Sequence, residues 1–223
     1  MRGFVSLMPP ARALAELDAV VGSLRVAHPE LRWTPTTQWH LTLAFLGEVD
    51  EGVLPDLGER IARAARRHPP TSLAFGGGGR FGDRVLWTRV HAAPYGTHPS
   101  ARESPVSTGR VSHSDRPRGG DDLRRLAASV TAAARRCGIA LDERPYRPHL
   151  TLARSRDGAD LRPAVAALAG FAGSPWTADA LHLVQSRLGA GPGGTAVHEV
   201  VGTWPLGRAP QPPDPTNGTA VGT

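Results

Sequence analysis

Apolar residues recur at two spacings along this chain of 223 residues, one typical of helices and one typical of strands. Apolar positions three and four residues apart predict helices that start at Pro9–Pro10, run from Asp50 to about His68, cover 121–137, and run from about Asp160 to Ala169. Apolar runs bounded by turn residues predict strands at 2–8, 71–75, 84–91, 180–188 and 196–204. A Gly-rich segment joins the strands at 71–75 and 84–91, and another joins those at 180–188 and 196–204, so the sequence predicts two hairpins.

The letters HLTLA occur twice, at 40–44 and at 149–153, with an offset of 109. Adding this offset to the element starts at 10, 50 and 71 gives 119, 159 and 180, close to where the elements of the second half begin. Recurrence at a fixed offset indicates that a structural unit has been copied. The sequence therefore predicts two modules, each made of a helix, a strand with the histidine, a helix and a hairpin.

These modules define the expected domain organisation. We expect one bilobal domain over 1–207, with repeat modules at about 10–91 and 121–204. Two segments outside the repeat, 94–120 and 208–223, are rich in Pro, Gly and polar residues and show no apolar periodicity. Such composition predicts a flexible loop insertion and a disordered tail.

Composition changes this interpretation little. The net charge of +6 suits a polyanionic partner such as RNA, but all 26 basic residues are arginines spread along the chain, so the charge alone identifies no partner. No apolar run is long enough to cross a bilayer and the N-terminus lacks a signal-peptide pattern, so we expect a cytoplasmic protein. The single cysteine, Cys137, excludes an internal disulfide and a cysteine-based zinc site, and we expect it in the core.

The doubled motif has a direct structural meaning. Successive side chains of a strand point to opposite faces, so the histidine and threonine share one face while the leucines occupy the other. The shared-face pairs are His40 with Thr42 and His149 with Thr151. If the two modules pack about a pseudo-twofold axis, both pairs line one cleft.

Two imidazoles in one cleft can act as a general acid and a general base near neutral pH, the pairing that cleavage of a phosphodiester requires. Threonine hydroxyls beside them can donate hydrogen bonds to phosphate oxygens. This chemistry needs no metal or other cofactor, and the sequence contains no HExxH spacing. We therefore expect a metal-independent reaction with a bell-shaped pH profile centred near neutral pH.

Several segments together carry a family resemblance: HLTLAFLG, RPHLTLAR, the opening RGFVSLMPP, the stretch FGGGGRFGDRVLWTRV and the closing LHLVQSRLG with WPL. The chain resembles the 2H phosphoesterases, specifically the RNA 2',3'-cyclic phosphodiesterases that are also known as bacterial 2'-5' RNA ligases. The resemblance covers nearly all of 2–207 apart from 94–120. It implies an α+β fold of two pseudo-twofold related lobes, each with an antiparallel sheet and helices, around a central cleft.

The resemblance also implies the chemistry. It implies a phosphoric diester hydrolase that opens 2',3'-cyclic phosphate ends of RNA or oligonucleotides to 2'-phosphates, with His40 as proton donor and His149 as proton acceptor. An arginine at the position of Arg154 is associated with substrate binding in the family, although strict alternation places Arg154 on the opposite face from His149 unless the strand ends or bulges. Near the last strand this chain has His198 where relatives tend to have a tyrosine.

Two alternatives stay open at this point. The chain is either such an enzyme, with 2'-5' joining as the reverse activity, or a non-catalytic RNA or nucleotide binding module on the same fold. We expect a monomer without contact to a membrane. Intact histidine and threonine in both motifs favour the enzyme.

Overall fold

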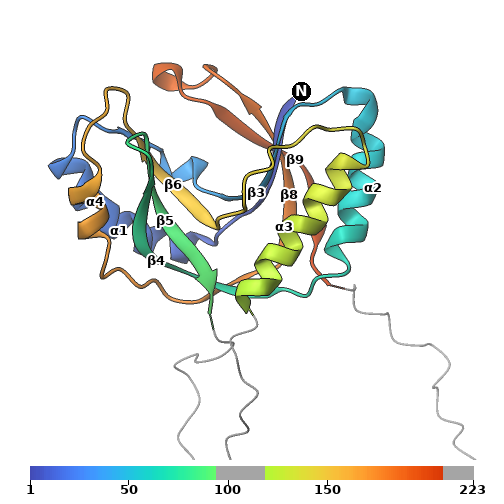
Figure 1. Cartoon of the computed structure of the whole chain (residues 1–223), viewed down its shortest axis with the longest axis horizontal. Coiled ribbons are helices and arrows are strands. Elements are labelled where there is room, and N and C mark those ends of the chain that lie inside the picture. Colours follow the sequence, from blue (N-terminus) through green and yellow to red (C-terminus); the bar gives the residue numbers. More distant parts are fainter. Residues whose placement is uncertain (94–118, 208–223) are drawn as a thin grey trace, which may run out of the picture.

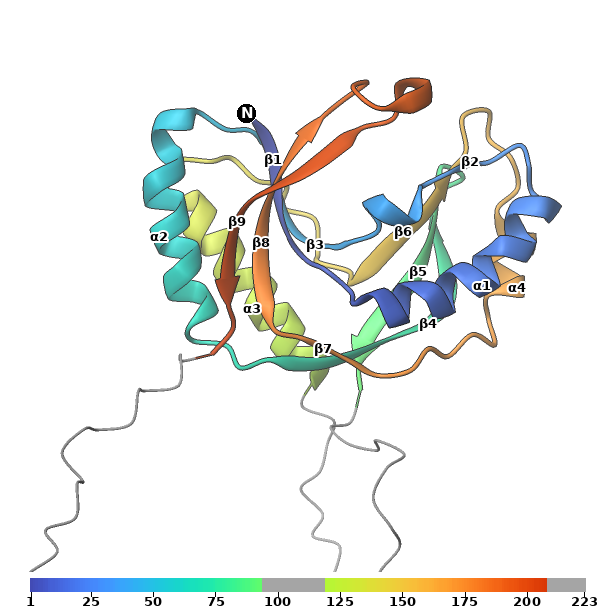
Figure 2. The same ribbon diagram turned by 180° about the vertical axis from the view of Figure 1, so that it is seen from behind.

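Two antiparallel β-sheets with helices on their outer faces make up the protein, as a computed structural model shows for residues 1–93 and 119–207 (Figures 1 and 2). One sheet has four strands in the order β3 (Leu41–Glu48), β1 (Arg2–Leu7), β8 (Ala180–Arg187) and β9 (Val197–Pro205). Helices α2 (Leu54–Ala65) and α3 (Gly119–Arg135) pack together against it (Figure 1).

The second sheet has five strands in the order β2 (Arg32–Trp33), β6 (His149–Arg154), β5 (Val85–Ala92), β4 (Thr71–Phe81) and β7 (Trp176–Ala178). Helix α4 (Arg162–Ala167) packs on β4 of this sheet, and helix α1 (Ala11–Ala27) bonds through Arg12 and Glu16 to the segment just before β7. Three short 3₁₀ helices complete the described elements: η1 (Thr36–Gln38), η2 (Glu51–Val53) and η3 (Pro192–Gly194). The predicted α+β fold with two lobes is confirmed.

The apolar spacing located the helices correctly. The inward stripe of α1 is fully buried at Leu17 and Val21, and that of α3 at Val130 and Ala134. Gly138 follows α3 with a φ of 76°, a conformation that glycine adopts without steric cost, so the chain turns there as predicted. None of the helices in the described ranges is both long and apolar enough to cross a membrane.

The first hairpin differs from the prediction, which placed its turn in the Gly-rich run. Strand β4 continues through these glycines to Phe81, and the turn follows at Gly82. A Cβ on Gly79 would lie 2.1 Å from the ring of Trp87, and a Cβ on Gly78 would lie 2.7 Å from Leu168. Gly78 and Gly79 are therefore required because other side chains approach the strand closely, whereas Gly77, with a φ of 65°, lies at an irregularity in the pairing with β5.

The two sequence modules are interlaced. The first histidine strand, β3, and the helix after it, α2, pack in the four-stranded lobe, but the hairpin that follows in the sequence, β4–β5, belongs to the five-stranded lobe. The second histidine strand, β6, joins β5, whereas the following hairpin, β8–β9, joins β1. Each lobe thus contains elements of both halves of the chain.

The lobes are not identical in strand order. Strand β1 separates β3 from the hairpin β8–β9, whereas β6 pairs directly with β5 of the other hairpin. The predicted loop and tail lie outside the described residues, except that 119 and 120 already belong to α3. Cys137, expected in the core, is only half-buried, and its thiol donates to Oδ2 of Asp56 at 3.3 Å.

Candidate active site

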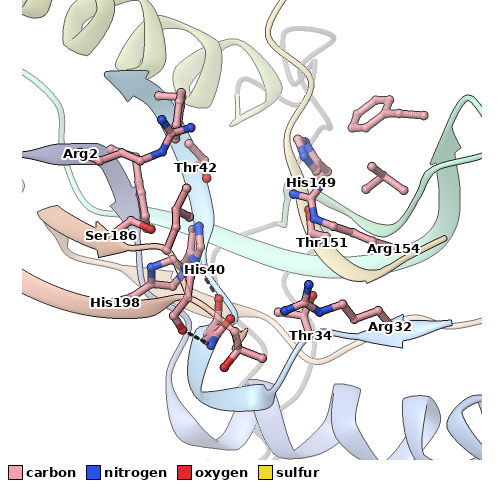
Figure 3. Close-up of a pocket in the computed structure, with 18 of the residues that line it drawn as sticks. Arg2, Arg32, Thr34, His40, Thr42, His149, Thr151, Arg154, Ser186 and His198 are labelled. Atoms are coloured by element: carbon pink, nitrogen blue, oxygen red, sulfur yellow. Dashed lines mark hydrogen bonds between the residues drawn. The ribbon is translucent and has the colours of Figure 1, made fainter. Parts of the chain in front are cut away.

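A cavity of about 950 Å³ is lined by residues of both sheets, and both histidine–threonine pairs contribute to it. Figure 3 shows His40 and Thr42 on one side of this cavity and His149 and Thr151 on the other. Strands β3 and β6 contact each other, which brings the two copies of the motif together. The expected shared cleft is therefore present, and its volume falls in the range of small-molecule sites.

A short turn holds His40 in place. Its Nδ1 lies 2.7 Å from the carbonyl oxygen of Gln38, and its ring stacks on Phe4 with centroids 4.4 Å apart. A carbonyl oxygen only accepts, so Nδ1 carries the proton and Nε2 keeps its lone pair for the cavity. The Gln38 side chain donates in turn to the carbonyl of Ala196 at 2.5 Å, which links this turn to the start of β9.

His149 repeats this arrangement on the opposite side. Its Nδ1 lies 2.6 Å from the carbonyl oxygen of Arg147, again two residues earlier in the chain. Phe81 meets the ring edge-on with centroids 4.8 Å apart, and Trp87 lies at 6.0 Å. The Gly-rich run of β4 therefore contributes to the site, because it gives room to the Trp87 ring beside His149.

Burial changes the protonation of both rings. It lowers the pKa of His40 from 6.5 to about 4, opposed by the hydrogen bond to Gln38 and assisted by positive charge on His198 and His149. Burial also lowers the pKa of His149, opposed by the bond to Arg147, while the charge of Arg154 lowers it further. Both rings are therefore mainly neutral at pH 7 in the free protein, with two Nε2 lone pairs toward the cavity.

A β-bulge occurs at the same place in both motifs. The pairing of β1 with β3 passes from Ala44 to Thr42 and skips Leu43, and the pairing of β5 with β6 passes from Ala153 to Thr151 and skips Leu152. The two residues after each threonine are consequently both buried. One extra residue in a strand reverses the alternation beyond it, so the sixth residue of each motif returns to the face of the histidine.

This bulge brings Arg154 to the cavity. From the sequence, Arg154 was expected there only if the strand ended or bulged. Arg154 is exposed and lies beside Thr151 (Figure 3). The equivalent residue of the first motif is Phe45, which is 49% exposed and also lines the cavity. The two copies therefore match in histidine, threonine and bulge, and differ in charge at the sixth position.

The cavity is strongly basic. Among its lining residues there is a single carboxylate, Asp142, and it is paired with Arg144, whose Nε lies 2.7 Å from Oδ2. The lining arginines are Arg2, Arg32, Arg144, Arg147 and Arg154. Such a surface suits an anion, and planar guanidinium groups suit phosphate oxygens in particular. No cluster of three or more metal-ligating side chains occurs among the described residues.

Sequence reasoning missed most of these neighbours. Phe4, Phe81 and the arginines other than Arg154 come from segments with no repeated motif, and they reach the cavity through pairing between distant strands. One signal was available for Arg154. Two consecutive apolar residues after each threonine, LA at 43–44 and at 152–153, break the alternation of a regular strand and indicate a bulge.

Replacing Arg154 with methionine is expected to raise the Kd for inorganic phosphate about 10-fold or more, because a hydrogen bond to a charged group is lost. The fold should be retained, since the side chain is exposed. The matched control is Arg156→Met, which removes the same charge two residues away from an exposed position outside the cavity. Equal phosphate affinity of the two variants would contradict a role of Arg154 in binding an anion.

The chain is similar to solved structures over almost its full length. A crystal structure of a Thermus thermophilus protein matches with a TM-score of 0.65 and 26% identity, over 94% of this chain and 100% of that one. Escherichia coli LigT in its apo form matches with a TM-score of 0.62 and 21% identity, over 93% and 98% of the two chains. Two sheets that each present a His-x-Thr pair to one cavity give this chain the fold of the 2H phosphoesterases.

The family follows from the sequence match. The chain belongs to the 2'-5' RNA ligase superfamily, whose sequence model matches residues 9–190. An RNA 2',3'-cyclic phosphodiesterase of Geobacillus stearothermophilus is 29% identical over 155 residues, which are 70% of this chain and 42% of that protein. Another of Bacillus subtilis (strain 168) is 32% identical over 133 residues, 60% of each protein. The chain thus spans less than two thirds of the length of these relatives.

Proposed function

We propose that this protein is an RNA 2',3'-cyclic phosphodiesterase that opens 2',3'-cyclic phosphate ends to 2'-phosphate ends by acid–base catalysis with two histidines. The observation that carries the proposal is the matched pair of imidazoles on opposite sides of one arginine-lined cavity, each fixed through Nδ1 by a carbonyl oxygen. The names of the Geobacillus and Bacillus relatives support the substrate class.

In this mechanism His149 acts as the base and His40 as the acid. Nε2 of His149 accepts a proton from water as the water oxygen bonds to phosphorus, and the bond from phosphorus to the 3' oxygen breaks. His40 in its protonated form donates its Nε2 proton to that oxygen, which leaves a 2'-phosphate. A phosphate anion next to His40 favours the protonated ring, so substrate binding opposes the effect of burial on its pKa.

The remaining polar groups stabilise charge. The hydroxyls of Thr42 and Thr151 lie on the same strand faces as the histidines and line the cavity, where they donate to the non-bridging phosphate oxygens. Arg154 adds a fixed positive charge on the His149 side. If a 5' hydroxyl takes the place of water, the same two proton transfers open the cyclic phosphate into a 2'-5' phosphodiester with the 3' oxygen as leaving group, so we propose reversible 2'-5' ligation as an accompanying activity.

Product analysis tests this function. Purified protein is incubated with an oligonucleotide that ends in a 2',3'-cyclic phosphate, and the products are separated from 2'- and 3'-phosphate standards. A 2'-phosphate product supports the proposal, whereas a 3'-phosphate product contradicts the assigned leaving group. Tight binding of the oligonucleotide without turnover identifies a binding module instead.

The pH at which kcat/KM is highest is expected to lie below 6.5, the unperturbed pKa of histidine. One ring must be protonated and the other neutral, so the maximum of kcat/KM falls between the two pKa values of the free protein. Burial lowers both, that of His40 to about 4, which moves the maximum below pH 6.5. The profile of kcat should lie at higher pH, because the bound anion favours protonation.

Removal of metal ions by a chelator is expected to leave the reaction unaffected. Both proton transfers are assigned to imidazoles, so dialysis against EDTA should leave kcat unchanged at every pH. The measurement compares chelated protein with the same protein after addition of Mg²⁺, Mn²⁺ or Zn²⁺. A loss of activity that a divalent ion restores would assign the reaction to a metal-dependent site.

A further inference from the structure

A third imidazole, that of His198 on β9, lines the cavity and has no part in the two-histidine mechanism. Its centroid lies 5.4 Å from that of His40 at an interplanar angle of 88°, and 5.2 Å from that of Phe4 at 87°. Figure 3 shows His198 next to His40, on the same side of the cavity. Its backbone pairs with Ser186 of β8, whose buried side chain also lines the cavity.

The two nitrogens of the His198 ring have different surroundings. Nδ1 is covered by protein and finds no hydrogen-bond partner in the part of the chain that the structure describes. The ring borders the cavity with its Nδ1 edge covered, so Nε2 is the nitrogen that a ligand can reach.

These surroundings determine where the proton of the neutral ring lies. A covered N–H without an acceptor is rarer in proteins than a covered acceptor without a donor, so the proton is placed on Nε2 rather than on Nδ1. Burial lowers the pKa of His198 and so favours the neutral ring. This tautomer is the opposite of that of His40 and His149, whose Nδ1 protons go to carbonyl oxygens.

A hydrogen-bond donor on His198 compensates for the difference between the two motifs at their sixth position. On the His149 side Arg154 offers N–H groups to an anion, whereas Phe45 occupies the equivalent position on the His40 side and offers none. The nearby guanidinium of Arg2 lies over the Phe45 ring at 4.8 Å and 3.7 Å from a carboxylate oxygen of Glu48. Of these two possible donors, Arg2 and His198, the one whose ring contacts the His40 ring is His198.

We propose that His198 binds substrate by donating a hydrogen bond from Nε2 to a phosphate oxygen on the His40 side of the cavity. It acts as a neutral donor and takes no part in proton transfer. The identity of the phosphate as a cyclic RNA end rests on the proposed function, but recognition of a phosphate group can be tested without it.

Two substitutions separate donation from packing, and a third tests the position of the donor. His198→Phe keeps an aromatic ring against His40 and Phe4 and removes the donor. His198→Gln places an amide N–H₂ near the position of Nε2, and His198→Asn places it near that of Nδ1 instead. The measurements are the Kd for inorganic phosphate at pH 7 and the pH profile of kcat/KM on a 2',3'-cyclic mononucleotide.

The expected result is a phosphate Kd raised about 10-fold or more in the Phe and Asn variants, with the Gln variant close to the unmodified protein. The limb set by His40 should move to higher pH by a similar amount in all three variants, because each removes the positive charge of His198 that lowers the pKa of His40. Thermal unfolding is expected at the same temperature or higher for His198→Phe, because the variant removes an unpaired buried nitrogen.

Two outcomes would overturn the proposal. One is unchanged phosphate affinity in the Phe and Asn variants. The other is a phosphate Kd that rises as much in the Gln variant as in the Phe variant, which would mean that a donor near the position of Nε2 does not bind the phosphate. If the unmodified protein turns over no cyclic phosphate, the proposed function fails, and the phosphate affinities still decide the role of His198.

Discussion

Replacing either His40 or His149 with alanine is expected to lower kcat at least about 100-fold, the usual contribution of a general acid or base. In the proposed mechanism each ring supplies one of the two proton transfers, and each presents only Nε2 to the cavity because a carbonyl oxygen holds Nδ1. The measurement is steady-state turnover of a 2',3'-cyclic mononucleotide, with thermal unfolding of each variant as the check on folding.

The double variant should lose far less than the product of the two single effects, because residues that act in one proton-transfer unit are not additive. The matched control is His182→Ala. His182 lies on β8 in the same sheet as the first motif, bonds to the hydroxyl of Thr203 at 3.1 Å and does not line the cavity. A single variant of His40 or His149 that is as active as this control would remove that residue from the mechanism.

The second large effect concerns folding. Fragments 1–93 and 119–207 prepared separately are each expected to lack a cooperative thermal transition, although each contains one complete sequence module. In the first fragment β1 loses its partner β8 and β5 loses its partner β6, so both sheets are interrupted. Circular dichroism during heating measures the result, and mixing the two fragments should restore the transition and the activity.

The control for this experiment is the intact chain cut once, after folding, at a protease site engineered between 93 and 119. The two pieces are held by strand pairing in both lobes, so the cut protein should keep its cavity and its turnover. A fragment 1–93 that unfolds cooperatively on its own would show that the first module is a self-sufficient lobe, contrary to the interlaced arrangement.

The local apolar pattern predicted those helices and strands well that bury one face in the core. The stripe of Leu17, Val21 and Leu24 identified α1, and the letters HLTLA identified both histidine strands, because burial of every third, fourth or second residue leaves a periodic trace. The same repeat identified all four residues of the two histidine–threonine pairs that line the cavity.

The rest depends on contacts between segments far apart in the sequence. The continuation of β4 through its glycines depends on Trp87, a residue on the neighbouring strand. The position of His198 depends on β9 joining β8, which carries it to the Phe4 and His40 rings. No local periodicity encodes which hairpin joins which sheet, so the exchange of hairpins between the modules could not be predicted from the pattern.

The exchange of hairpins also has a consequence for synthesis on the ribosome. Strand β1 carries the fully buried Val5 and Leu7, and its partner β8 begins only at Ala180. At a synthesis rate of about 5–20 residues per second, the N-terminal strand waits roughly 10–35 s for that partner. During this time one edge of β1 and its apolar side chains are available to chaperones or to other nascent chains. The cavity is complete only after the hairpin β8–β9 has left the exit tunnel, so chains that terminate before β8 lack one part of its lining.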